Sequence, residues 1–287
     1  MVESTSEFAR AQNMSVRQVI YIITGLIFLT RALSCAAETV GAPAKAIQDN
    51  SFLIEEAYNQ EAGVIQHINA WRLLDKDWFY TFTEEWPVVT QLHQLSVTVP
   101  YSRLQNSGEH QSGFGDVQLN YRYQLSFEGA DRPAIAPRAS LILPTGDEKD
   151  GLGSGSTGFQ VNLPVSKIVA DNLTLHTNAG VTTFFDVGGH SPTSYNIGGS
   201  FIYAVSRNFN LMLEGLEEWS ETVDGFGNVE NDSAFTISPG TRYALNLEGG
   251  TQVVVGAAAP IRFENGNTDY GVFLYLSIEH DASHLPL

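Results

Sequence analysis

Positive charge, cysteine and long apolar runs are all scarce in this sequence of 287 residues. The 15 lysines and arginines stand against 32 aspartates and glutamates, and the formal net charge of −17 excludes a nucleic-acid-binding surface. The single cysteine, Cys35, excludes a disulfide framework and a site built from several thiolates. After residue 40 no apolar run approaches the ~20 residues that a membrane-spanning helix needs.

Glycine and aromatic residues are abundant where charge is scarce. Charged residues make up 16% of the chain, aromatic residues 11%, and there are 26 glycines. This composition suits strands, tight turns and a lipid-facing surface. The mean hydropathy of −0.08 excludes a bundle of membrane helices but allows a β-barrel, in which apolar and polar residues alternate and average out.

Residues 1–37 have the layout of a cleaved signal peptide. Arg17 precedes the apolar run 19–29, and small residues follow at 34–37. Translation is expected to begin at Met14, which would make 1–13 a non-native extension.

Two alternatives to cleavage stay open for this segment. A membrane-anchoring helix is disfavoured because the run is much shorter than the ~20 residues of a span. A lipoprotein acylated at Cys35 is disfavoured because the leucine expected three places before the cysteine is absent. Cleavage before Ala37 or Glu38 is the preferred prediction.

Residues 116–127 alternate without exception between apolar and polar side chains. The stretch 117–127 is ten steps long, or about 33 Å, and a tilt of about 40° would project it onto the apolar band of an outer-membrane barrel. Strands of a soluble β-sandwich, the alternative fold, are usually about 5–6 residues long. In 78–88 the same alternation puts Glu84 on the lipid face, so either the register shifts there or Glu84 lies beyond the apolar band.

Repetition of this pattern predicts an all-β fold: a transmembrane, antiparallel, up-and-down β-barrel of about 12 strands. Prolines 100, 137, 164 and 239 fall inside the proposed strands and make their bounds uncertain. Strands are expected near 63–74, 78–88, 92–104, 114–127, 134–144, 157–168, 172–185, 194–205, 208–220, 232–244, 250–262 and 269–280. Short turns are expected at 75–77, 170–172, 206–208 and 245–247, and long external loops at 105–113, 145–156, 186–193, 221–231 and 263–268.

The mature chain is therefore expected to have three parts. An N-terminal segment, 38–62, precedes the barrel, which spans 63–280, and a short tail, 281–287, follows it. Residues 50–62 are too apolar for a free tail, and we expect them either to plug the barrel mouth or to form a periplasmic flap. The plug candidates are Phe52, Glu55, Glu56 and Tyr58.

Candidate lumen residues are the polar members of the alternating strands, and they suit small neutral or weakly polar solutes. They are Gln118, Asn120, Arg122, Gln124, Gln160, Asn162, His176 and Asn178. The acidic net charge predicts that anions are disfavoured.

Little in the sequence indicates catalysis. His176 is expected to be a hydrogen-bonded lumen residue, and no histidine lies in a nucleophile motif. Residues 151–158 are rich in glycine but lack the lysine of a phosphate-binding loop and precede a strand, so we expect a flexible external loop. An acidic group in the preceding loop is a possible cation site, although a solvated loop is favoured. Its members are Asp147, Glu148 and Asp150.

Three stretches resemble the outer-membrane family named after the MetA pathway of phenol degradation. They are SFLIEEAYNQE at 51–61, GFGDV at 113–117 and LILPTGD at 141–147 with its continuation to Lys167. The resemblance implies a barrel in the outer membrane that passes small, aromatic or hydrophobic compounds. It also implies lipid, lipopolysaccharide and the barrel assembly machinery as partners. The assembly signal is expected at 275–280, because the chain does not end in the aromatic residue usual for such barrels.

The function favoured by these patterns is a passive outer-membrane channel with no enzyme activity, cofactor or resident metal. An outer-membrane hydrolase is the first alternative and predicts a Ser–His or Asp–His pair at one rim. A structural or adhesion barrel without transport is the second and predicts an occluded lumen.

Overall fold

The computed structural model describes residues 47, 51–74, 76–106, 109–224 and 226–282. The expected signal peptide, Cys35 and residues 283–287 of the expected tail lie outside these residues, and so does most of 38–50. No described helix combines the length and apolar character of a membrane span.

The described chain is a single sheet of fifteen strands and one short 3-10 helix. The first seven strands are β1 (Val64–Leu74), β2 (Asp77–Val88), β3 (Thr90–Asn106), β4 (Glu109–Phe114), β5 (Val117–Tyr123), β6 (Ala134–Ile135) and β7 (Arg138–Leu143). The next five are β8 (Gly158–Ala170), β9 (Leu173–Phe184), β10 (Thr193–Ser206), β11 (Phe209–Val223) and β12 (Val229–Asn246). The 3-10 helix η1 (Glu248–Gly250) and strands β13 (Gln252–Ala258), β14 (Ile261–Glu264) and β15 (Asn267–Asp281) complete the order.

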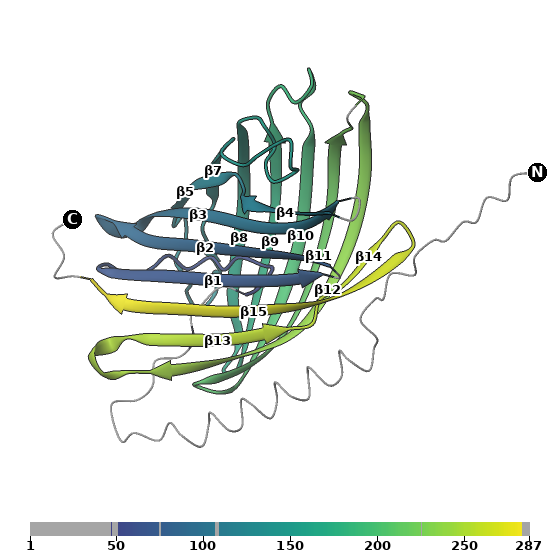
Figure 1. The fold of residues 1–287 in the computed structure, drawn as a ribbon. Coiled ribbons are helices and arrows are strands. Elements are labelled where there is room, and N and C mark those ends of the chain that lie inside the picture. The colour runs from purple at the N-terminus through teal and green to yellow at the C-terminus, as the bar shows by residue number, and fades with distance from the viewer. Residues whose placement is uncertain (1–46, 48–50, 75, 107–108, 225, 283–287) are drawn as a thin grey trace, which may run out of the picture.

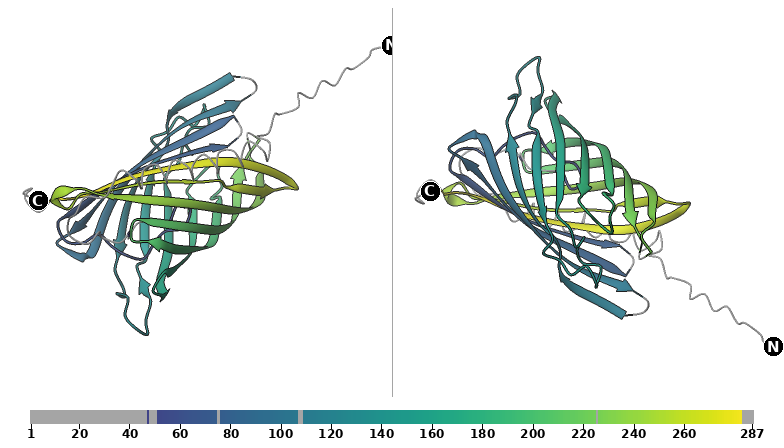
Figure 2. Two further views of the ribbon diagram at one scale, coloured as in Figure 1. Left: turned by 90° about the horizontal axis from the view of Figure 1, so that it is seen from below. Right: turned by 90° about the horizontal axis from the view of Figure 1, so that it is seen from above.

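The sheet closes on itself. Every pairing is antiparallel, and β1 pairs with β15 from Val64–Asp281 to Leu74–Gly271, so the first and last strands form the seam. Figure 1 shows the ring from the side, with β1, β2, β3, β13 and β15 crossing steeply over β8 to β11 behind them, and Figure 2 shows it from below and above. The steep crossing is the strand tilt that closure of a sheet into a barrel requires.

Fifteen segments make twelve barrel strands, because three places in the ring are each occupied by two consecutive segments. These interrupted strands are β4–β5, β6–β7 and β13–β14, which pair with β3, β8 and β12. The predicted all-β barrel of about twelve strands is confirmed.

Prolines explain the interruptions. Pro100, Pro164 and Pro239 lie opposite the three breaks and accept hydrogen bonds there from Gly115, Ala136 and Ala259, at N–O distances of 2.9, 3.2 and 2.9 Å. Because proline has no N–H, the return bond of each pair cannot form and the regular ladder stops for a residue or two. The strand expected at 114–127 is divided in the same way, and its regular part is β5.

The two faces of the barrel follow the predicted alternation. In β5, Leu119, Tyr121 and Tyr123 are exposed on the outside, whereas Asn120 and Arg122 are buried inside. Glu84 does face outward, and the β2 pairing shows no shift at that position. Its carboxylate lies 3.2 Å from Nδ1 of His67, close to the end of the barrel where β1 begins, which compensates its position on the apolar side.

The connections at the two ends of the barrel differ in length, as expected. Three of the predicted long loops are wrong. At 105–113, 221–231 and 263–268 the strands instead extend into hairpins, which keep their backbone groups paired. The β1–β2 turn is short yet lies at the same end as the longer connections, because successive strands alternate in direction. We call this end the loop side and the end where β1 begins and β15 ends the terminal side.

The β7–β8 connection, residues 144–157, is anchored to the wall by Asp116. The Asp116 carboxylate accepts hydrogen bonds from the backbone N–H of Gly146 (2.9 Å), the backbone N–H of Ser154 (2.7 Å) and the Ser154 hydroxyl (2.6 Å). A Cβ on Gly146 or Gly153 would come within 2.7 Å of the facing chain, so glycine permits this close approach. The second and third resembling stretches therefore meet here, and residues 151–158 are not the free flexible loop that was expected.

Substituting Asp116 by alanine is expected to release this connection without unfolding the barrel. Hydrogen bonds to a charged group contribute about 1.5–3 kcal/mol each, so local opening should increase by at least ~10-fold. Tryptic cleavage after Lys149, which is exposed, should accelerate accordingly. Asp171→Ala, in the β8–β9 turn at the opposite end, is the matched control. Equal cleavage rates in both variants would show that Asp116 does not hold the connection.

Candidate functional site

The inward faces of the strands form a polar lumen, and the predicted lumen residues lie on them. Asn120, Arg122, Gln124, Asn162, His176 and Asn178 are buried, and Gln118 and Gln160 are half-buried. Several other inward residues are charged or polar but are not among the candidates predicted from the sequence. The most important of these are Arg72, Arg138, Ser166, Glu214, Arg242 and Arg262.

Residues 51–60, here the lumen segment, run through the interior of the ring. At its first end the Ser51 hydroxyl donates to the Ser200 hydroxyl on β10 (2.7 Å). Next, one carboxylate oxygen of Glu214 on β11 accepts the backbone N–H of Leu53 (2.8 Å) and that of Ile54 (3.2 Å). A buried glutamate thus satisfies two backbone donors that have no strand partner.

The middle of the lumen segment is held by β7, β8 and β9. Glu55 forms an ion pair with Arg138 on β7. The backbone N–H of Ala57 donates to the Ser166 hydroxyl on β8 (2.7 Å), whose oxygen lies 2.6 Å from Nδ1 of His176 on β9. His176 therefore has the structural hydrogen-bonding role expected of a lumen histidine, because it orients the hydroxyl that binds Ala57.

Arg122 on β5 holds the second end of the lumen segment. Its guanidinium donates to the carbonyl oxygens of Glu56 (3.2 Å) and Tyr58 (2.8 Å) and to Oδ1 of Asn59 (2.8 Å). Gln124 adds a two-way contact: its oxygen accepts Asn59 N–H (3.0 Å) and its amide donates to the Ala57 carbonyl (2.8 Å). Such repeated anchoring fixes the path of a segment that has no secondary structure of its own.

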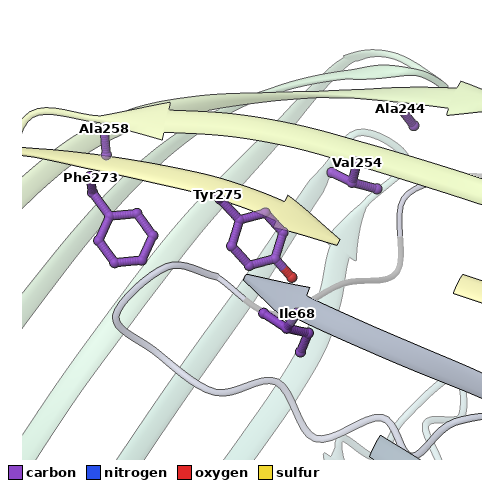
Figure 3. Packing of buried hydrophobic residues seen from close by; sticks show 6 residues of the cluster. All are labelled: Ile68, Ala244, Val254, Ala258, Phe273 and Tyr275. Atoms are coloured by element: carbon purple, nitrogen blue, oxygen red, sulfur yellow. The ribbon is translucent and has the colours of Figure 1, made fainter. Parts of the chain in front are cut away.

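Apolar packing fixes the first end of the lumen segment. The Phe52 ring stacks on Phe273 at a centroid distance of 5.1 Å and lies 5.3 Å from Tyr275. Phe273 and Tyr275 belong to an inward apolar cluster with Ile68, Ala244, Val254 and Ala258, drawn in Figure 3 on β1, β12, β13 and β15, and Phe52 packs against this cluster. A Cβ at Gly256 would come 2.5 Å from Phe52, and one at Gly198 would come 2.3 Å from Ile54. Glycine on the wall thus makes room for the segment.

The charges on the lumen segment are set by their neighbours. Burial raises the pKa of the Glu55 carboxyl, but the Arg138 guanidinium and its hydrogen bonds outweigh burial, and the pKa lies below its ordinary value. Burial and the Glu128 carboxylate both raise the pKa of the Tyr58 phenol, which donates to Glu128 at 2.6 Å. Glu55 is therefore an anion and Tyr58 a neutral donor at neutral pH.

Cavities remain on both sides of the lumen segment. On the loop side a cavity of about 560 Å³ is lined by Leu53 and Glu55 together with inward residues of the wall. On the terminal side a cavity of about 420 Å³ is lined by Glu56 and Tyr58. A third space of about 270 Å³ lies along the β1–β5 wall next to Ser51–Glu55. The lumen is thus divided by the segment rather than filled.

The lumen contains a pair of side chains of the kind that catalyses hydrolysis. Ser166 and His176 form a Ser–His pair, but Ser166 is completely buried and its oxygen already accepts Ala57 N–H. A nucleophile must be reachable by substrate, so this geometry favours an anchoring role. Within the described ranges, no three His, Cys, Asp or Glu side chains are grouped so that they could hold a metal ion. The side chains of Asp147, Glu148 and Asp150 are accordingly not grouped around a common point in the described loop.

Comparisons with known proteins agree with this architecture. The family model described as "Putative MetA-pathway of phenol degradation" matches residues 47–276. An outer membrane channel from Pseudomonas putida F1 is similar in structure, with a TM-score of 0.59 at 12% identity, and the alignment covers 82% of this chain and 99% of that one. A KdgM porin has a TM-score of 0.46 at 13% identity, covering 73% and 97% of the two chains. No curated protein matches this sequence.

Loss of the Arg122 anchor is expected to expose the lumen segment. Ala57 is completely buried, so a cysteine placed there, in a Cys35→Ala background, should resist a membrane-impermeant maleimide. Adding Arg122→Ala removes three charge-assisted hydrogen bonds and should accelerate labelling by at least ~10-fold.

Val89→Cys supplies the control, because Val89 is 92% exposed in the β2–β3 turn and should label equally fast in both backgrounds. Slow labelling of Ala57→Cys in the Arg122→Ala protein, with Val89→Cys unchanged, would mean that Arg122 does not anchor the segment.

Proposed function

This chain belongs to the family described as the "Putative MetA-pathway of phenol degradation", and we propose that it is an outer-membrane channel through which small solutes diffuse passively. The observation that carries the proposal is a closed ring of strands that is apolar outside and polar inside, with cavities at both ends of its lumen. A lipid-facing apolar band around a polar interior is the design of outer-membrane barrels.

The outward surface supports insertion into lipid. Large apolar side chains are exposed along strand after strand, including Leu119, Phe159, Ile197, Phe201, Leu211 and Phe235. A soluble protein seldom exposes so continuous an apolar surface. Together with the signal peptide that the sequence predicts at residues 1–37, this surface supports export to the outer membrane, where lipid, lipopolysaccharide and the assembly machinery would be the partners.

We propose that the lumen segment is a plug that limits passage through the barrel. Leu53 and Glu55 line the loop-side cavity and Glu56 and Tyr58 line the terminal-side cavity, so the segment lies between the two. Phe52, Glu55, Glu56 and Tyr58, the plug candidates of the sequence, all belong to it. The contacts with Arg122, Arg138 and Glu214 favour a plug over a free periplasmic flap.

The alternatives fit the geometry less well. A hydrolase needs a reachable nucleophile, and the Ser166–His176 pair is buried beneath Ala57. A structural or adhesion barrel predicts an occluded lumen, whereas about 560 and 420 Å³ remain open on the two sides of the segment. Small solutes, including the aromatic or hydrophobic compounds that the family resemblance implies, are compatible with these volumes.

Fractionation tests the location and the closed barrel together. The processed protein should be found in outer membranes, require detergent for extraction, and migrate faster on SDS gels before heating than after it. The shift occurs because the closed hydrogen-bonded barrel stays folded and compact in detergent until the sample is heated. A processed chain that is soluble without detergent and shows no heat-dependent shift would refute the channel proposal.

Deleting residues 51–62 is expected to raise the single-channel conductance in planar bilayers at least ~2-fold, because the segment lies in the lumen between the two cavities. The deletion variant must show the heat-dependent gel shift of the intact protein, which establishes that its barrel has formed. Phe52→Ala, which removes the stacking on Phe273 but keeps the backbone, should increase brief openings without changing the fully open level. Unchanged conductance and gating in both folded variants would end the plug proposal.

A further inference from the structure

The loop-side cavity is lined by charged, amide and apolar side chains, and the carboxylates of Glu55 and Glu218 are among the charged ones. Arginines 72, 138 and 262 contribute the positive charge. Amides and hydroxyls come from β8, β9 and β10, and the apolar part comes from β1, β2, β11 and the lumen segment. A cavity of about 560 Å³ is large enough for a small organic molecule.

Arg72 is the one of these three arginines that forms no ion pair, although the Glu218 carboxylate lies within electrostatic reach of it. Arg138 is paired with Glu55, and Arg262 is paired with Glu218 and Glu264 at 3.0 Å each. Arg72 forms neither an ion pair nor a hydrogen bond with any described residue, and its guanidinium carbon lies 4.8 Å from the centre of the Phe79 ring. A guanidinium that faces a cavity without a carboxylate partner is suited to bind an anionic group, above all a carboxylate.

Two amides on the opposite wall have free acceptors. Oδ1 of Asn162 and Oδ1 of Asn178 have no hydrogen-bond partner in the described part of the chain, although both side chains are only 5% exposed. A buried acceptor is normally paired with a donor, so these two oxygens are suited to accept a hydrogen bond from a bound solute. A hydroxyl or N–H on a solute would supply one.

Apolar side chains make up a further part of the wall. Leu74, Phe79 and Leu216 face inward from β1, β2 and β11, and Leu53 comes from the lumen segment. The Phe79 ring also stabilises the Arg72 guanidinium by a cation–π contact, which holds the charge next to the apolar surface. An apolar or aromatic body fits between the arginine and the amides.

We propose that the loop-side cavity is a binding site for small aromatic or apolar carboxylates that also carry a hydroxyl donor. Arg72 binds the carboxylate, Asn162 and Asn178 accept the hydroxyl, and Leu53, Leu74, Phe79 and Leu216 contact the body of the solute. The site deepens the proposed function on which it rests, because it names the class of solute that enters the channel.

The site reverses the preference expected from the acidic composition of the chain. Net charge is a property of the whole surface, and carboxylates in the exposed connections act at a distance at which salt screens them. A partly buried guanidinium that forms no ion pair acts at contact distance and in a lower dielectric, so it favours an anionic group at its own position in the cavity.

The experiment is single-channel recording with three probes of one size added on the loop side. The probes are 4-hydroxybenzoate, benzoate, which lacks the donor, and 4-hydroxybenzamide, which lacks the charge. We expect 4-hydroxybenzoate to block the current at the lowest concentration, with each of the others roughly 10-fold weaker, the loss typical of one strong hydrogen bond or ion pair.

Substitutions test the contact of Arg72 with the carboxylate and the contact of the two asparagines with the hydroxyl separately. Arg72→Gln should weaken block by 4-hydroxybenzoate roughly 10-fold or more and leave block by 4-hydroxybenzamide unchanged, whereas Arg72→Lys should retain most of the block. Asn162→Leu with Asn178→Leu should bring 4-hydroxybenzoate to the level of benzoate. Arg103→Gln is the matched charge control, because Arg103 is exposed on the outer face of β3. Each variant is compared only if it shows the heat-dependent gel shift.

The outcomes separate this inference from the proposed function. A folded barrel with no conductance would refute the channel and the site together. Conductance without probe-specific block, or block that is the same for all three probes, would overturn the binding site and leave the channel intact. Equal loss of block in Arg72→Gln and Arg103→Gln would show that long-range charge, and not the Arg72 contact, is responsible.

Discussion

The backbone ladder that joins β1 to β15 is the constraint on which the rest of the structure depends. Eleven residue pairs, from Val64–Asp281 to Leu74–Gly271, leave no free strand edge at the seam. In hydrocarbon an unpaired N–H or C=O costs several kcal/mol, so a sheet that spans a membrane must close. Pro100, Pro164 and Pro239 are tolerated within strands because each lies opposite a break in its neighbour and still accepts one hydrogen bond.

Closure of the ring produces a wide polar interior, and the lumen segment occupies part of it. A ring of twelve strands is wider than the eight-stranded barrels whose side chains fill their interior. The inward faces also carry charged groups, such as Arg122 and Glu214, that would be costly to bury without partners. The segment supplies carbonyl oxygens to Arg122 and N–H groups to Glu214, so it stabilises the polar wall while it divides the lumen.

The sequence predicts well which side chains of the wall point inward and which point outward, because this alternation is a local property of each strand. A period of two residues assigned Asn120 and Arg122 to the inside and Tyr121 to the outside without knowledge of any partner strand. Patterns of this kind extend to β8, β9 and β10, from which the other lumen candidates came. The predicted strand bounds were wrong where a proline in one strand interrupts the neighbouring strand. The position of such an interruption depends on which strands pair and in which register.

The contents of the lumen could not be predicted in the same way. Which side chains face each other across a closed ring depends on strand order and stagger, and one strand's alternation contains neither. Arg138 follows Pro137, at a point where the regular alternation of the strand breaks. Glu214 lies at an inward position of an alternating strand, but its role is to accept the backbone N–H groups of residues 53 and 54, which are far away in the sequence. The sequence showed that 50–62 is too apolar for a free tail, but not which wall receives it.

The wall and the lumen segment are shaped for one another, and this limits how the channel can open. Gly198, Gly240 and Gly256 leave room on the wall for Phe52 and Ile54, where a Cβ would come within 2.3 to 3.0 Å of a segment side chain. The first end of the segment is held by this packing and by neutral donors to Glu214. The second end is held by the Arg122 guanidinium and continues through Gly63 into β1. Because the second end is covalently joined to the wall and more strongly bonded, we expect displacement of the proposed plug to begin at Phe52–Ile54. On this proposal the apolar cluster under Phe52 governs the opening of the lumen, and the arginine contacts define the hinge about which it opens.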